Sequence, residues 1–459
     1  MIVTAPNGCF SDDSLVLTGG DATVVARGFE CVLPDFSQAS SSVLNTLQDQ
    51  VRLALRSLPE HQRLQIQWFC DPDYGAYLDR YERESERTVN AWVCQCRSER
   101  VERYRALMRT GQLRRQRLVL FVTQRLIDPP LLSTRRNVLI KHLHGVITQV
   151  AEGLCLTGRT TADALSGQGI RLTPMRDADH YQLYARLLNP SLDDRPDYNP
   201  LATFAPSLSL HDNCWLAEAV GTRTGFELDG YSHALLVLTR WPQSTYPGIL
   251  HRLTRLHQLR FQITLNVEPL PVMDEIQKEE RRYARLQGEY KAEGRPSLAT
   301  VLEKKEHKIH QLMKGFLRPF RVQFIVRVWA RNPEELTLAM AGLKQAINGM
   351  NGAQYFQPAL PSTTRKLWFQ TWPGWTWGTC RRWYLYAEDT YLADLLPLTS
   401  SACGYLAEAE AIYDGPEGSL VGVKTASQPG PTGAPQHAVI FGATGSGKSM
   451  LIADLLTQT

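Results

Sequence analysis

The C-terminal end of the sequence carries the residues whose types and order point most directly to chemistry. The pattern G-x-x-x-x-G-K-[ST], which surrounds the phosphates of a nucleotide, is matched by Gly442, Ala443, Thr444, Gly445, Ser446, Gly447, Lys448 and Ser449. The glycines lack the Cβ atom that would block a tight loop and the approach of phosphate oxygens. Consecutive backbone N–H groups at a helix N-terminus can then surround the negative charge.

Two side chains of this loop have distinct expected roles. Lys448 supplies a mobile positive charge for the β- and γ-phosphates, and the hydroxyl of Ser449 is the expected ligand of Mg²⁺. We therefore predict ATP and Mg²⁺ as cofactors, held by the eight residues of the loop. The alternative is a glycine-rich turn with an incidental lysine.

The motif needs a strand before it and a helix after it, and the sequence predicts both. Residues 437–441 (HAVIF) form a short apolar run typical of a strand, and residues 450–459 (MLIADLLTQT) have helical spacing. Hydrolysis needs more: a carboxylate that holds the metal, a group that orients water and, usually, an arginine from a neighbouring subunit. We find none of these before Thr459, so we predict no catalytic residue within this chain and no hydrolysis by it alone.

Three segments, in this order along the chain, carry a resemblance to a family. They are 183–190 (LYARLLNP), 394–398 (DLLPL) and 437–449 (HAVIFGATGSGKS). Together they resemble the TraC-like ATPases of type IV secretion and conjugative transfer. The resemblance covers the N-terminal part of that family and ends one helix into the motor domain.

The resemblance implies an ATP-binding component of a conjugative DNA-transfer or type IV secretion machine. In the intact protein, ATP hydrolysis would energise channel assembly or substrate transfer. It also implies channel components at the inner membrane as partners, a homo-oligomer formed through the motor domain, and a cytoplasmic location peripheral to that membrane. Direct nucleic-acid binding stays open. The alternative function is a non-catalytic docking module with a vestigial P-loop.

The pattern of the rest of the chain predicts two similar halves. Strand-like runs at 23–33, 64–69 and 118–123 are followed, about 200 residues later, by runs at 234–239, 261–267 and 322–329. A long charged helical stretch lies between the second and third run of each half. The predicted fold class is α/β: a mixed α+β region with duplicated β-α-β-α-β-α halves, then the start of a P-loop NTPase domain. Chance similarity is the alternative to duplication.

These patterns suggest four segments. Residues 1–157 form the first α/β half, and residues 158–355 form the second, with an irregular insertion at 158–230. Residues 356–435 form a Trp-rich connecting region that ends in a Pro/Gly linker. Residues 436–459 are the expected start of a truncated P-loop domain.

Composition excludes several classes of protein. Of 459 residues, 50 are Lys or Arg and 46 are Asp or Glu, so the net charge is only +4, which gives no reason to expect wholesale nucleic-acid binding. No apolar run reaches the roughly 18 residues that a membrane span requires, and the N-terminus has no signal-peptide pattern. The nine scattered cysteines are expected to be core thiols in a reducing compartment.

Three further groups each have a functional and a structural interpretation, and the structural one is favoured in each case. Eight arginines in 97–117 fit contact with lipid, DNA or an acidic partner, or a helix of Glu–Arg pairs. Five tryptophans in 368–383 fit a partner surface or a packed core. His307 and His310 fit a metal pair or a solvated pair.

Overall fold

The structure is a computed structural model that describes residues 5–458 apart from a number of short segments. The residues left undescribed are 1–4, 21, 35, 37, 38, 72, 73, 86–89, 127–135, 168, 195–199, 215, 216, 223, 257, 258, 379, 381, 399–403, 405, 416, 417, 425–438 and 459. The expected Pro/Gly linker therefore lies outside the described residues.

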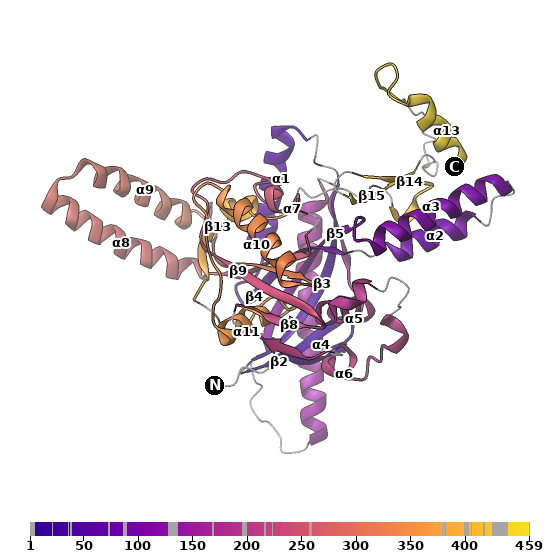
Figure 1. Ribbon diagram of the computed structural model, residues 1–459. Coiled ribbons are helices and arrows are strands. Elements are labelled where there is room, and N and C mark those ends of the chain that lie inside the picture. The colour runs from indigo at the N-terminus through magenta and orange to yellow at the C-terminus, as the bar shows by residue number, and fades with distance from the viewer. Residues whose placement is uncertain are drawn as a thin grey trace, which may run out of the picture.

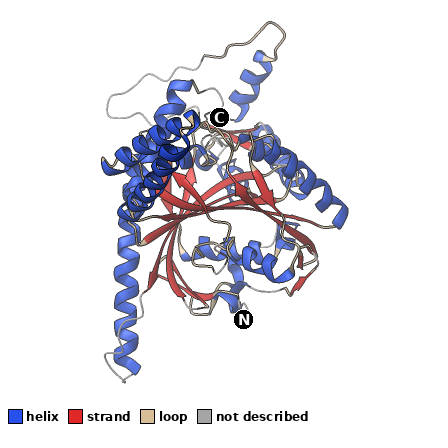
Figure 2. Ribbon diagram, turned by 90° about the vertical axis from the view of Figure 1, so that its left-hand side faces the viewer, coloured by secondary structure: helices blue, strands red, loops and turns tan. Residues whose placement is uncertain are grey.

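One antiparallel sheet, 13-stranded in the described part of the chain, runs through the centre of the molecule (Figures 1 and 2). The first half extends past its expected boundary at residue 157, because β6 pairs with β3, and the second extends past residue 355, because β13 pairs with β11. The first half contributes β1 (Asn7–Ser11), β2 (Ser14–Gly19), β3 (Ala22–Val32), β4 (Gln62–Asp71), β5 (Arg115–Leu126) and β6 (Arg171–Pro174). The second half contributes β7 (Ala219–Gly221), β8 (Phe226–Leu228), β9 (Tyr231–Arg240), β10 (Phe261–Pro269), β11 (Pro319–Ala330), β12 (Gln354–Phe356) and β13 (Leu385–Glu388). All six strand-like runs expected from the sequence are strands.

The order of the strands is a palindrome. The path is β1-β2-β3-β5-β4-β10-β11-β9-β8-β7, so each strand of the first half has its counterpart in the second half at the mirrored place. The two halves meet where β4 pairs antiparallel with β10, for example Ile66 opposite Leu265. The match continues beyond this path, because β6 pairs with β3 as β12 pairs with β9. The halves thus share the strand order that a duplication predicts.

The helices follow the same plan. The first half has α1 (Ser41–Ser57), α2 (Gly75–Ser85), α3 (Ala91–Arg109), α4 (Arg136–Ser166), α5 (Asp177–Leu188) and α6 (Leu210–Cys214). The second half has α7 (His251–Thr254), α8 (Val272–Glu293), α9 (Pro296–Met313), α10 (Pro333–Asn348), α11 (Pro361–Phe369) and α12 (Asp389–Asp394). In each half, one helix, a helical hairpin and a third helix follow the three long strands in turn, which gives the expected α/β fold.

In the first half, the hairpin α2–α3 replaces the single long helical stretch that the sequence predicts. Asn90 starts α3 anew, because its side chain accepts a hydrogen bond from the Trp92 N–H at 3.1 Å. An Asn at this position caps a helix and so favours a break in front of it. In the second half, Gly294 ends α8 in a left-handed conformation (φ 62°), and Pro296 begins α9.

Both faces of the sheet are covered, as Figure 2 shows. On β4, Leu64, Ile66 and Trp68 join the core beneath α1, α4 and α10, whereas Gln65 and Gln67 face the opposite side. That opposite side is covered by α5, α6, α11 and the Trp-rich segment. Strand alternation therefore supplies one apolar face and one partly polar face at the centre of the sheet.

Region 158–230 is more ordered than the sequence suggested, and the tryptophan cluster is packed as expected. The described residues of 158–230, expected to be irregular, include the end of α4, strands β6–β8, helices α5 and α6, and the short 3-10 turns η1 (Pro190–Asp194) and η2 (Pro200–Thr203). The tryptophan cluster is packed core, as its structural interpretation predicts, since Trp368, Trp372 and Trp375 are 3%, 0% and 4% exposed.

The chain ends in three further elements beyond a 3-10 turn, η3 (Leu406–Glu408). Strands β14 (Ala411–Asp414) and β15 (Leu420–Val423) pair as a separate hairpin, and α13 (Lys448–Gln458) follows. In Figure 1 these elements lie beside α2 and α3, while α8 and α9 project from the opposite side of the sheet. Among the described helices, none combines the length and apolarity needed to cross a membrane.

Candidate nucleotide-binding site

The backbone of the loop 442–449 has the conformation that its glycines permit. Gly445 and Gly447 have φ angles of 80° and 83°, in the left-handed region that disfavours residues with a Cβ. The Ser446 N–H donates to the Ala443 carbonyl at 3.1 Å and closes a turn. A Cβ on Gly442 would lie 2.5 Å from Ser446 Oγ, so a side chain at this position would clash with Ser446.

Lys448 is the first residue of α13, and its side chain folds back across the loop. Its ammonium donates to the carbonyl oxygens of Gly442 and Ala443, each at 2.7 Å. Ser449 follows in the first turn of the helix and is exposed. The predicted cation and the predicted magnesium ligand therefore stand side by side at the N-terminus of α13.

The strand expected at 437–441 is not formed by its described residues. Positions 437 and 438 lie outside the described residues, and residues 439–441 are in no strand. Val439 and Phe441 are 71% and 90% exposed. The physical reason is that an apolar strand of a parallel sheet is stable only when neighbouring strands and covering helices bury it.

The helix expected after the motif is present, but much of its apolar surface is uncovered. Met450, Leu451, Ile452 and Leu456 are 76%, 42%, 42% and 72% exposed. Apolar side chains at helical spacing stabilise a helix mainly by packing against another element. One side of α13 is therefore apolar and exposed.

The C-terminal end of α13 is held by a buried glutamine. Gln458 is 2% exposed, and its Oε1 accepts hydrogen bonds from the Tyr81 hydroxyl at 2.8 Å and from the Ile412 N–H at 3.1 Å. The Arg97 side chain donates to the backbone carbonyl of Gln458 and, at 3.0 Å, to that of Glu410. One residue thus joins α13 to both the α2–α3 hairpin and the β14–β15 hairpin.

An ion pair adds a second contact one turn earlier on α13. Asp454 Oδ1 lies 2.5 Å from Nη2 of Arg100, and its other oxygen accepts from Gln458 Nε2 at 2.6 Å. Burial, followed by the nearness of Asp454, raises the pKa of the Tyr413 hydroxyl to about 12. Tyr413 therefore stays protonated at neutral pH and adds no charge to this contact.

Most of the arginines of 97–117 are engaged within the chain. Arg105 contacts Asp79 and Glu82, both at 2.8 Å, and Arg103 pairs with Asp414 at 2.9 Å. Arg115 and Arg117 both pair with Glu30. This agrees with the structural interpretation of the segment and adds that several arginines reach other elements rather than their own helix.

The other candidate residues form no site among the described residues. No group of three or more His, Cys, Asp or Glu side chains there is arranged to hold a metal. His307 Nε2 lies 2.7 Å from the Gln311 side-chain nitrogen. The described cysteines are free thiols, and burial raises the pKa of Cys31 to about 12.

Comparisons with known proteins do not assign a family. A scan of protein-family models found none that matches the chain. A search of curated proteins found no match either. The interpretation of the site therefore depends on the loop, on α13 and on their contacts.

The residues that hold α13 could not be identified from the motif. Arg97 lies 361 positions before Gln458, and Tyr81 lies 377 positions before it. The one available signal was the density of arginines in 97–117, which pointed to an interaction without naming its partner.

Proposed function

We propose that this chain is the ATP-binding component of a conjugative DNA-transfer or type IV secretion machine, in which ATP hydrolysis by the intact protein energises channel assembly or substrate transfer. The observation that carries ATP binding is the loop 442–449, with two left-handed glycines and Lys448 at the start of α13. The type of machine rests on the resemblance of the three segments named above.

The loop fits a phosphate group by its shape and by its donors. A side chain at 442 would clash with Ser446, and the loop leads into the N-terminus of an eleven-residue helix, where N–H groups without intrahelical partners favour negative charge. Lys448 would exchange the Gly442 and Ala443 carbonyls for phosphate oxygens, and Ser449 would hold Mg²⁺. MgATP would supply the transferable phosphoryl group and the metal charge that stabilises it.

The proposal extends to place and partners. The two α/β halves would form the docking part, in contact with channel components at the cytoplasmic side of the inner membrane. Homo-oligomers would form through the motor domain of the intact protein. No described helix spans a membrane, which is compatible with a peripheral position.

A second candidate function is a docking module with a vestigial P-loop. It is favoured by one observation, the attachment of α13 through Gln458 and Asp454 to the α2–α3 hairpin, which gives the P-loop segment a structural role. In this alternative, the loop would bind nucleotide weakly or not at all.

Calorimetry with MgATP and a transfer assay together separate the two functions. Lys448→Ala should abolish MgATP binding, because it removes the mobile cation of the loop, while the exposed Lys304→Ala on α9 should leave it unchanged. The same Lys448 allele in donor cells should abolish DNA transfer. Unchanged MgATP affinity would overturn nucleotide binding, whereas lost affinity with normal transfer would favour the docking module.

Phosphate release gives an independent test of the expected inactivity of this chain. Steady-state release by the 459-residue chain should not exceed that of its Lys448→Ala variant, because the carboxylate and water-orienting groups are not supplied. Clear turnover above this background would show that another part of the chain provides them.

A further inference from the structure

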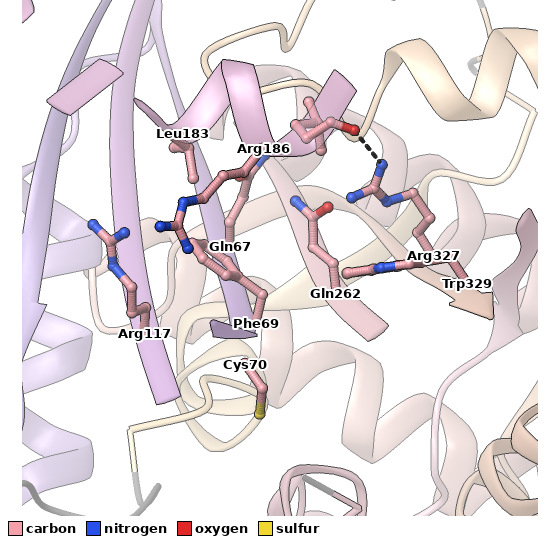
Figure 3. A pocket seen from close by; sticks show the side chains of 10 residues that line it. Gln67, Phe69, Cys70, Arg117, Leu183, Arg186, Gln262, Arg327 and Trp329 are labelled. Carbon is pink, nitrogen blue, oxygen red and sulfur yellow. Dashed lines mark hydrogen bonds between the residues drawn. The ribbon is translucent and has the colours of Figure 1, made fainter. Parts of the chain in front are cut away.

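A hollow lies far from the P-loop in the chain, at the junction of the two halves. Counted out to the solvent, its volume is about 470 Å³. Its floor is the partly polar face of the central strands, and α5 lines it from above (Figure 3).

The register of the sheet places four lining residues in one row. Arg117 on β5 is opposite Phe69 on β4, Phe69 is opposite Gln262 on β10, and Gln262 is opposite Arg327 on β11. Directly opposed residues point to the same face of a sheet. Since neighbouring strands are about 4.8 Å apart, the two arginines stand roughly 14 Å apart across the floor.

A third arginine completes the positive charge of the hollow. Arg186 extends from α5 and lies on the Arg117 side of Gln262 in Figure 3. No Asp or Glu is among the lining residues. Arg117 pairs with Glu30 outside the lining, at 3.2 Å, and Arg327 is 3% exposed and lies over the Trp329 ring at 4.6 Å.

Two buried acceptors face the same region. The side-chain nitrogens of Gln67 and Gln262 both donate to the Thr371 carbonyl, at 2.9 and 3.3 Å. This fixes the orientation of both amides, because only the NH₂ end can donate. Their Oε1 atoms are buried and have no hydrogen-bond partner. Buried polar atoms of this kind are normally satisfied by protein, water or ligand.

We propose that this hollow binds a nucleoside monophosphate, as a site separate from the P-loop. The phosphate would be held by Arg186 with Arg117 or Arg327, since guanidinium groups match phosphate oxygens in charge and geometry. The N–H donors of the base would reach Gln67 or Gln262, and Phe69 or Trp329 would offer a flat face for stacking. An inorganic anion would satisfy the arginines but leave both glutamine oxygens without donors.

The test uses the Lys448→Ala chain, so that the P-loop does not contribute. Calorimetry is run with the four ribonucleoside monophosphates, with the matching nucleosides and with inorganic phosphate. At least one monophosphate should bind more tightly than both its nucleoside and phosphate. No binding, or equal binding of phosphate alone, would overturn the proposal.

Two variants assign the binding to this hollow. Arg186→Gln, at a half-buried position, should weaken the monophosphate by about tenfold, while the exposed Arg171→Gln on β6 should have no effect. Gln262→Met should lower monophosphate affinity without changing that for phosphate, because it removes an acceptor and keeps the charge. Thermal unfolding confirms that each variant is folded, and unchanged affinity in both would contradict the assignment.

Discussion

The helical hairpins α2–α3 and α8–α9 occupy matching places in the two halves, but their surroundings differ. The first packs on β14–β15 through a core that includes Tyr74, Tyr104 and Ile412, and it holds the end of α13. The second projects from the sheet, with a small core at its base formed by Ile276, Leu312 and Leu317. The same insertion point thus carries a hairpin that packs on α13 in one half and a projecting hairpin in the other.

The two hairpins also handle charge differently. In α8–α9, Glu279 is 1% exposed and contacts Lys305 at 2.5 Å, Arg282 at 2.9 Å and Lys308 at 3.5 Å. In α2–α3, the arginines reach outward to Asp414 and Asp454. The projecting hairpin thus has a buried charge cluster centred on Glu279, whereas α2–α3 combines exposed internal pairs of Arg105 with pairs to β14 and α13.

The largest effect is expected from breaking the charge cluster of the projecting arm. Glu279→Gln leaves Lys305 without its carboxylate, while Lys308 keeps its pair with Glu388 at 3.0 Å. The loss should destabilise the hairpin by about 3 kcal/mol. Hydrogen exchange of the α8 and α9 amides should accelerate accordingly, while Glu303→Gln, at an exposed position of α9, should change little. Equal exchange in both variants would show that apolar contacts alone hold the arm.

Removing the buried arginine under α13 should have the next largest effect. Arg97→Leu leaves the carbonyls of Gln458 and Glu410 without this donor, at a cost of about 2 kcal/mol. We expect hydrogen exchange to become faster throughout 448–458 and to stay unchanged in α8–α9. The control is Arg103→Leu, because the side chain of Arg103 is 66% exposed and its loss should be nearly neutral. A uniform change in exchange across the sheet would mean that Arg97 stabilises the whole fold rather than the docking of α13.

The ion pair between Arg100 and Asp454 should contribute less. Both side chains are partly exposed, at 21% and 35%, so a coupling of about 1 kcal/mol is expected. A double-mutant cycle of Arg100→Met and Asp454→Asn, followed by the urea midpoint and by exchange of α13, measures it. A coupling of zero would assign the docking of α13 to Gln458 and its partners.

A pH titration should show the smallest effect and should act on the projecting arm. Burial would raise the pKa of the Glu279 carboxyl, but the bond from Lys305 and the charges of Lys308 and Arg282 outweigh it and hold the pKa below 4.5. Its stabilisation is therefore complete above pH 4.5 and is lost as the pH falls through the lower, folded value. The difference in melting temperature between wild type and Glu279→Gln should shrink only below pH 4.5.

Much of the fold could be predicted from local patterns. Apolar alternation identified the long strands, and their spacing indicated two similar halves. The pairing of β4 with β10 could not be predicted, because alternation shows that a strand has a buried face but does not identify its neighbour. The docking position of α13 could not be predicted either, because it depends on residues of α2 and α3 that lie more than 350 positions earlier. The strand expected before the P-loop does not form among the described residues, because an apolar run needs neighbouring strands to pair with.

The palindromic strand order has a consequence for the unpaired edges of the sheet. Two separate copies of a half would each have β4 or β10 as a long open edge, a template for unwanted pairing with other chains. Joined in one chain, these two edges pair with each other across an approximate two-fold axis, as edge strands do in a symmetric dimer. The ends of the main path are then β1 and β7, of only 5 and 3 residues. Covalent fusion therefore makes the closure of the sheet independent of protein concentration.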